Sequence, residues 1–236
     1  GYLQDCVTYV DTDGDAARDS SEPTTSSDAT GYYSTPYTSA GSTRVFVAPS
    51  SGSTCVDSIS GSQLSVPLLT EADAAMLTPL TSVAVFVREQ QPSLSQADAS
   101  ALVSAGFSLT AEDVWSFDAL VAALFGTPPM AVGDVSWFVR QMQVQTSVTC
   151  VKEAYSARAG TYELALASYA ELASMLTSQA TIDLSSEADF TTFTQGAKTR
   201  LNITGAPASF VASNARFSRK FCGESRRIAG NSDLYV

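Results

Sequence analysis

Residues 11–22 concentrate carboxylates at the spacing that wraps oxygen ligands around one cation. Acidic residues stand at loop positions 1, 3, 5, 9 and 12, the register of an EF-type calcium loop. The residue at position 7, an alanine, would contribute its backbone carbonyl, as this position normally does. Such closely spaced carboxylates repel one another unless a hard divalent ion neutralises them. We therefore expect Ca²⁺ as a structural component, with the ligands Asp11, Asp13, Asp15, Ala17, Asp19 and Glu22.

The loop departs from the EF-hand pattern in two ways. Its sixth position, where the sharp turn favours glycine, is Ala16, and a glycine stands two residues earlier as Gly14. Only one apolar, strand-like run, Cys6–Val10, flanks the loop, whereas an EF-hand has a helix on each side. We therefore predict an EF-type loop on a β framework. The alternative is a solvated acidic loop that binds no ion.

Histidine is absent from the chain, which restricts the chemistry that it can perform. The absence removes histidine-activated nucleophiles, the usual general base at neutral pH and the commonest zinc ligand. The sequence also contains no glycine-framed nucleophile elbow and no phosphate-binding loop. We expect no enzymatic activity and no catalytic residues. A hydrolase that uses two facing carboxylates in a cleft is the remaining enzymatic alternative.

Four widely spaced cysteines, Cys6, Cys55, Cys150 and Cys222, indicate a disulfide framework. They form no CxxC pair, which argues against a zinc site or a thioredoxin-like motif. Three connectivities are available, and we favour Cys6–Cys55 with Cys150–Cys222, because each pair then stays within one compositional region. Four buried thiols are the alternative.

An extracellular location, at a cell surface or in a matrix, fits these features. The triplet that begins at Asn202 is an acceptor for N-glycosylation. The chain has no leader at Gly1, so we expect a mature or excised segment, and it has no apolar run long enough to span a membrane. The net charge of −11 and the pI near 4.3 argue against nucleic acid and anionic membranes as partners.

The composition changes near residue 70 and predicts an α+β protein with two domains. Residues 1–68 are rich in Ser, Thr, Gly, Tyr and Pro, and turn signals separate the short β-prone runs of a small antiparallel β-sandwich. These runs are Cys6–Val10, Gly31–Tyr33, Thr43–Val47 and, more weakly, Thr54–Ile59.

Residues 69–230 are predicted to form an α-helical bundle, and 231–236 a tail or linker. Apolar residues there recur about every 3.5 positions, and capping residues mark seven helices with short connections. The first follows Thr78-Pro79 and ends at Gln91-Pro92. The others run from Ser95 to Gly106, from Ser116 or Asp118 to Gly126, from Gly133 to Tyr155, from Thr161, after Ser186 and after Pro207.

Charge is polarised along the chain. Residues 1–100 hold twelve acidic and three basic residues, whereas residues 198–236 hold seven basic and two acidic residues. The basic tail of one module is therefore suited to meet the acidic head of the next. A solvated basic helix face is the alternative.

The stretch from Tyr9 to Tyr33 resembles the B-type, prealbumin-like repeats of bacterial surface adhesins. Those repeats carry a D-x-N-x-D-G-x-x-D-x-x-E-P loop and then a T-x-D-x-x-G-x-Y hairpin, and the resemblance covers roughly residues 5–65. The present loop differs in having Asp13 where Asn is usual and in the early position of Gly14. The run Thr78–Val83 also resembles the T-P-L-T-T-L element that follows such sandwiches in large secreted repeat proteins of bacteria and green algae.

The resemblance implies an extracellular structural module, which links or builds a cell-surface filament, matrix fibre or adhesin and self-associates or contacts neighbouring modules. The alternative is a monomeric binding module whose helical half recognises a glycan or peptide. For the two-domain arrangement, we expect Asp11→Ala or Glu22→Ala to destabilise the sandwich and to leave the helical bundle nearly unchanged.

Overall fold

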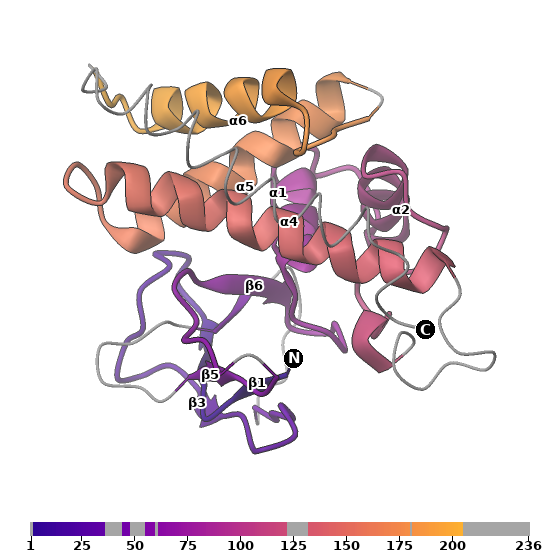
Figure 1. Ribbon diagram of the computed structural model, residues 1–236. Helices are drawn as coiled ribbons and strands as arrows, with labels where there is room; N and C mark the ends of the chain where they lie inside the picture. Colours follow the sequence, from indigo (N-terminus) through magenta and orange to yellow (C-terminus); the bar gives the residue numbers. More distant parts are fainter. Residues whose placement is uncertain are drawn as a thin grey trace.

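The computed structural model describes residues 2–35, 44–47, 55–59, 61–121, 132–179 and 181–204, the side chains of 132–135 excepted. Small antiparallel sheets come first along the chain and helices follow, so the predicted α+β class is confirmed (Figure 1). The strands are β1 (Leu3–Gln4), β2 (Val7–Asp11), β3 (Thr24–Ser26), β4 (Arg44–Val47), β5 (Val56–Asp57) and β6 (Leu68–Glu71). The helices are α1 (Pro79–Gln90), α2 (Gln96–Gly106), α4 (Val132–Tyr155), α5 (Thr161–Ser178) and α6 (Glu187–Arg200).

The main sheet has four strands in the order β3-β2-β4-β6, and β1 pairs separately with β5. All pairings are antiparallel. The register places Tyr9, Phe46 and Leu69 side by side on one face, and the rings of Tyr9 and Phe46 stack with centroids 5.2 Å apart. Because side chains alternate along a strand, Thr8 and Leu68 belong to the opposite face. We call these the helix face and the groove face.

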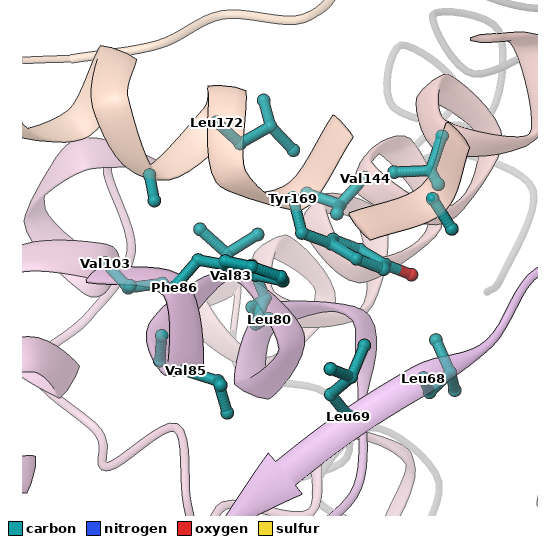
Figure 2. Packing of buried hydrophobic residues seen from close by; sticks show 14 of the residues in the cluster. Leu68, Leu69, Leu80, Val83, Val85, Phe86, Val103, Val144, Tyr169 and Leu172 are labelled. Carbon is teal, nitrogen blue, oxygen red and sulfur yellow. The ribbon is translucent and has the colours of Figure 1, made fainter. Parts of the chain in front are cut away.

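One buried hydrophobic cluster joins the sheet to the helices. It includes Tyr9, Phe46 and Leu69 from the helix face together with residues of α1, α2, α4, α5 and α6. Figure 2 shows Tyr169 and Leu172 of α5 close to side chains of α1, with Leu69 of β6 beneath that helix. The finer prediction, a self-contained sandwich followed by a separate bundle, is therefore not confirmed. The predicted boundary between residues 68 and 69 falls inside β6.

The first turn of α1 covers the edge of the sheet. Thr78 caps the helix and forms a capping box with Thr81, and Pro79 occupies the first turn, where its missing N–H costs nothing. The Thr81 hydroxyl donates to the carbonyl of Leu69 over 2.8 Å, and the Ser82 hydroxyl accepts from the Leu69 amide over 2.9 Å. These hydroxyls satisfy backbone groups that the edge strand β6 would otherwise leave unpaired.

The predicted strands are right in part. The runs Cys6–Val10 and Thr43–Val47 correspond to β2 and β4, and the weaker run Thr54–Ile59 contains β5. The prediction of a strand at Gly31–Tyr33 is wrong. Three donors, the amides of Thr30 and Tyr32 and the Thr30 hydroxyl, bond Oδ1 of Asp28, and Gly31 has a φ of +79°, so the chain turns here.

Most of the predicted helices are confirmed. The helices α1, α2, α4, α5 and α6 begin close to the predicted positions, and α1, α2 and α4 also end close to theirs. The predicted helix from Ser116 or Asp118 to Gly126 is described only up to residue 121, where 119–121 are helical. The helix predicted after Pro207, the tail 231–236 and the basic cluster at 216–227 lie outside the described residues.

Candidate metal centre

The end of strand β2 delivers the first carboxylate of the loop. Asp11 is only 3% exposed, since it follows the buried residues of the strand. Its two oxygens accept the amides of Gly14 over 2.7 Å and of Ala16 over 3.3 Å. These bonds turn the chain back over Asp11 and fix the direction of its side chain.

Two residues of the turn adopt left-handed backbone conformations. Gly14 has a φ of +83° and Ala16 a φ of +62°. Ala16 thus takes, as an alanine, the conformation for which glycine is favoured at the sixth loop position. It is buried, and its carbonyl accepts the Tyr9 hydroxyl over 2.9 Å, so contacts with β2 hold it in place.

The turn brings three carboxylates together. Asp11, Asp13 and Asp15 each offer an oxygen, and these oxygens lie within 4.8 Å of one another. Oxygen ligands of one Ca²⁺ ion at about 2.3–2.6 Å lie at most about 5 Å apart, so this spacing fits a shared hard cation. Asp13 and Asp15 are exposed, which leaves the cluster open to solvent on one side.

Glu22 closes the loop from its other end. The side chain is buried, and its oxygens accept the amides of Thr12 over 2.8 Å and Asp19 over 3.0 Å. Among the described residues the three-carboxylate cluster does not include Glu22 or Asp19. Asp19 is exposed, and Ala17 donates its amide to Asp15 over 2.7 Å. The ligand roles of Ala17, Asp19 and Glu22 stay predictions.

Burial makes the charge on Asp11 costly. Desolvation raises the pKa of its carboxyl, and the amides of Gly14 and Ala16 and the charge of Arg44 oppose that rise. Nearby Glu22 raises the pKa further. A cation bound at the cluster would favour the ionised form of these carboxylates.

A charged row connects Asp11 to the helices, and sequence reasoning did not identify it. In the sheet register Asp11 lies opposite Arg44, and Arg44 opposite Glu71. Arg44 forms an ion pair with Glu89 of α1 and stands 5.9 Å above the Phe86 ring, and Arg88 pairs with Glu71. These residues are far apart in sequence, and the pairing of the strands brings them together. A prediction of this row would have needed the strand register.

One predicted disulfide is confirmed, and the other involves a cysteine outside the described part of the chain. Cys6 and Cys55 are bonded across 49 positions, which encloses the carboxylate loop in a covalent ring. Cys150 is buried in α4, and its predicted partner Cys222 is not among the described residues. Asn202 is exposed just beyond α6 with a φ of +52°, and its glycosylation stays a prediction.

Comparisons with protein-family models, with curated proteins and with solved structures found no match. The resemblance of residues 5–65 to B-type repeats therefore rests on the quoted motifs alone. Among the described helices, none combines the length and the apolar character that crossing a bilayer requires.

Proposed function

We propose that this chain is a structural module of an extracellular assembly, in which Ca²⁺ bound by the loop 11–22 stiffens the sheet. The observation that carries the proposal is the convergence of the Asp11, Asp13 and Asp15 oxygens within 4.8 Å at the end of a buried strand. Three carboxylates held this close repel one another, and a divalent ion converts that repulsion into attraction.

Calcium suits the donor set better than other common ions. All the side-chain donors are carboxylate oxygens, which suit hard cations, and the chain has no histidine for zinc. Ca²⁺ accepts six to eight oxygens in flexible geometry, so the proposed set adds the Ala17 carbonyl, Asp19 and Glu22. Exposure of Asp13 and Asp15 leaves room for water to complete the shell.

Calcium binding and the disulfide would act on the same segment. An ion present at about ten times its dissociation constant stabilises the folded state by about 1.4 kcal/mol. Sites in extracellular modules bind with dissociation constants of about 0.1–1 mM, within reach of extracellular calcium. The Cys6–Cys55 disulfide supports the same location, since such bonds persist in oxidising compartments.

Thermal unfolding in millimolar calcium and in chelator tests the proposal. The parent should melt several degrees higher in calcium, and Asp11→Ala, Asp15→Asn and Glu22→Ala should lose most of that difference. Asp5→Asn is the matched control, because Asp5 is exposed, lies outside the loop and has a φ of +54° that Asn tolerates. A parent that melts at one temperature in both buffers would refute the calcium assignment.

A further inference from the structure

A large cavity lies against the groove face of the sheet. Its volume is about 1010 Å³, and the N-terminal segment, the connection from β6 to α1 and helix α4 complete its walls. The lining is mainly apolar and includes Leu3, Val45, Leu68, Leu77, Phe138 and Met142. At its mouth Tyr32 is 67% exposed and Met142 is 46% exposed. The cavity is thus an open groove with apolar walls.

The charged groups of the groove have one sign. Asp57 and Asp118 line it, and no Lys or Arg is among its described lining residues. Asp118 accepts the Tyr2 hydroxyl over 2.6 Å, and burial and this carboxylate raise the pKa of Tyr2 to about 12. Acidic groups beside apolar walls favour a basic, amphipathic occupant.

Two lining residues also have unused hydrogen-bonding capacity. The hydroxyl of Thr8 and the side-chain carbonyl of Gln145 are buried, and neither has a partner in the described part of the chain. Buried polar groups are nearly always paired in folded proteins. Such a lining, apolar with a few unpaired polar atoms, is typical of a binding site.

Residues 205–236 of this chain combine the basic and apolar side chains that the groove favours. Residues 205–236 carry five basic and two acidic residues, whereas residues 1–204 carry eight basic and 22 acidic residues. Phe210, Phe217 and Phe221 are spaced by seven and four, a sequence pattern typical of an amphipathic segment. Arg216, Arg219 and Lys220 stand between or beside them in sequence.

We infer that the groove receives the basic, apolar tail segment 208–227 of a second copy of this chain. The inference deepens the proposed function by naming the partner surface, and it rests on the assembly role and not on calcium. Because groove and tail are different surfaces, the contact is heterologous and extends from copy to copy.

The position of α6 favours a second copy over the chain's own tail. Helix α6 packs on α5 and α4, and in Figure 1 it forms the layer farthest from the sheet. The tail therefore begins on the opposite side of the helices from the groove. To reach the groove, the chain's own tail would have to pass around the helices, whereas the tail of a neighbouring copy would not.

Sedimentation velocity of the full chain over a dilution series, in saturating calcium, tests the inference. Association should weaken about tenfold or more in the groove variant Met142→Lys and in the tail variant Arg216→Glu/Arg219→Glu/Lys220→Glu. Met142→Glu removes the same apolar surface with the opposite charge, and it should associate at least as well as the parent. Ile59→Lys adds a charge at an exposed apolar residue outside the groove lining, and it should leave association unchanged.

Mixing the groove variant with the tail variant tests whether these two surfaces contact each other. The Met142→Lys protein and the triple tail variant should associate with each other better than either does alone, since the new basic groove meets a new acidic tail. A parent that stays monomeric across the series overturns the inference, whether its groove holds its own tail or a small molecule. Association that Met142→Lys does not weaken also overturns it. The calcium-dependent melting shift of the same samples reports separately on the metal site.

Discussion

Ala16 shows how a single residue shapes the carboxylate loop. Its φ of +62° lies in the left-handed region, which costs an alanine about 1–2 kcal/mol relative to the usual conformation. The bond from the Tyr9 hydroxyl to its carbonyl and the bond from its amide to Asp11 hold it there. The loop therefore keeps its turn at some cost in stability.

Ala16→Gly should stabilise the protein by about 0.5–1 kcal/mol, because glycine adopts this φ without strain, although it gains entropy in the unfolded state. Urea unfolding in chelator measures the change without interference from metal binding. Ala17→Gly is the matched control, since Ala17 is not among the described residues with positive φ, and it should be neutral or destabilising. A less stable Ala16→Gly variant would contradict this account.

The sequence predicts the loop better than it predicts the surroundings of the loop. The spacing of Asp11, Asp13 and Asp15 was sufficient to foresee that their carboxylates meet, because ligands in one short turn are set by local geometry. No sequence pattern indicated the ion pair between Glu71, at the end of β6, and Arg88 of α1. That contact depends on strand pairing, which local patterns do not report.

At the scale of elements, the junction between β6 and α1 depends on two buried hydroxyls. Thr81 accepts the Thr78 amide over 2.8 Å and donates to the Leu69 carbonyl. Ser82 bonds the Leu69 amide. The helix cap and the strand edge therefore share the same side chains.

Thr81→Val keeps the shape of the side chain and removes its hydroxyl, so the buried Thr78 amide loses its partner. We expect a loss of about 1–3 kcal/mol, measured by urea unfolding. Thr192→Val makes the same change at an exposed position of α6 and should alter stability by less than about 0.5 kcal/mol. Equal effects of the two substitutions would argue against the proposed role of Thr81.

Arg44→Met should destabilise the protein by about 1–3 kcal/mol, because it removes the ion-pair partner of Glu89 and the positive charge opposite Asp11. Burial already raises the pKa of Glu89, and Arg44 opposes that rise. Without Arg44 the folded-state pKa rises further above the unfolded value, so the loss should be smallest below about pH 4 and should grow as the pH rises through the folded-state pKa.

Denaturant unfolding at several pH values in saturating calcium measures this profile. Arg158→Met is the control, since Arg158 is exposed, and its effect should be small at every pH. A loss that does not depend on pH would assign the effect of Arg44→Met to packing on Phe86.

Capping signals explain why the helices were predicted well and some strands were not. Thr78 and Ser95 both form capping boxes, and such local bonds set helix starts wherever the helix later packs. The strands β3 and β6 were missed, since Thr24–Ser26 is polar and short, and Leu68–Glu71 alternates weakly. Their strand character comes from pairing with β2 and β4.

At the scale of the whole molecule, sheet and helices share one buried cluster. The sequence suggested two domains because the composition changes near residue 70, yet composition reports local propensity and not which faces meet. The helix face of the sheet shares this cluster with residues of α1, α4 and α5, and β6 packs on α1. A loss of order in the sheet therefore exposes apolar surface of the helices.

The shared core leads us to expect one cooperative unfolding transition. Urea curves from circular dichroism at 222 nm, which reports the helices, should coincide with hydrogen exchange in β2 and β4. Calcium should then raise the unfolding midpoints of the helices and of the sheet together, and Asp11→Ala should lower both midpoints. For two independent domains, we would expect Asp11→Ala to lower the midpoint of the sheet alone. Two separate midpoints would show that sheet and helices unfold independently.

The Cys6–Cys55 bond has a consequence for a module that bears tension. When the chain is pulled by its ends, force passes from residue 6 to residue 55 through the sulfur atoms, and the residues between them carry none of it. The carboxylate loop lies within this bypassed stretch. Under load the carboxylates of the loop are not drawn apart, and unfolding releases about 160 Å less chain than it would without the bond, at roughly 3.3 Å per residue.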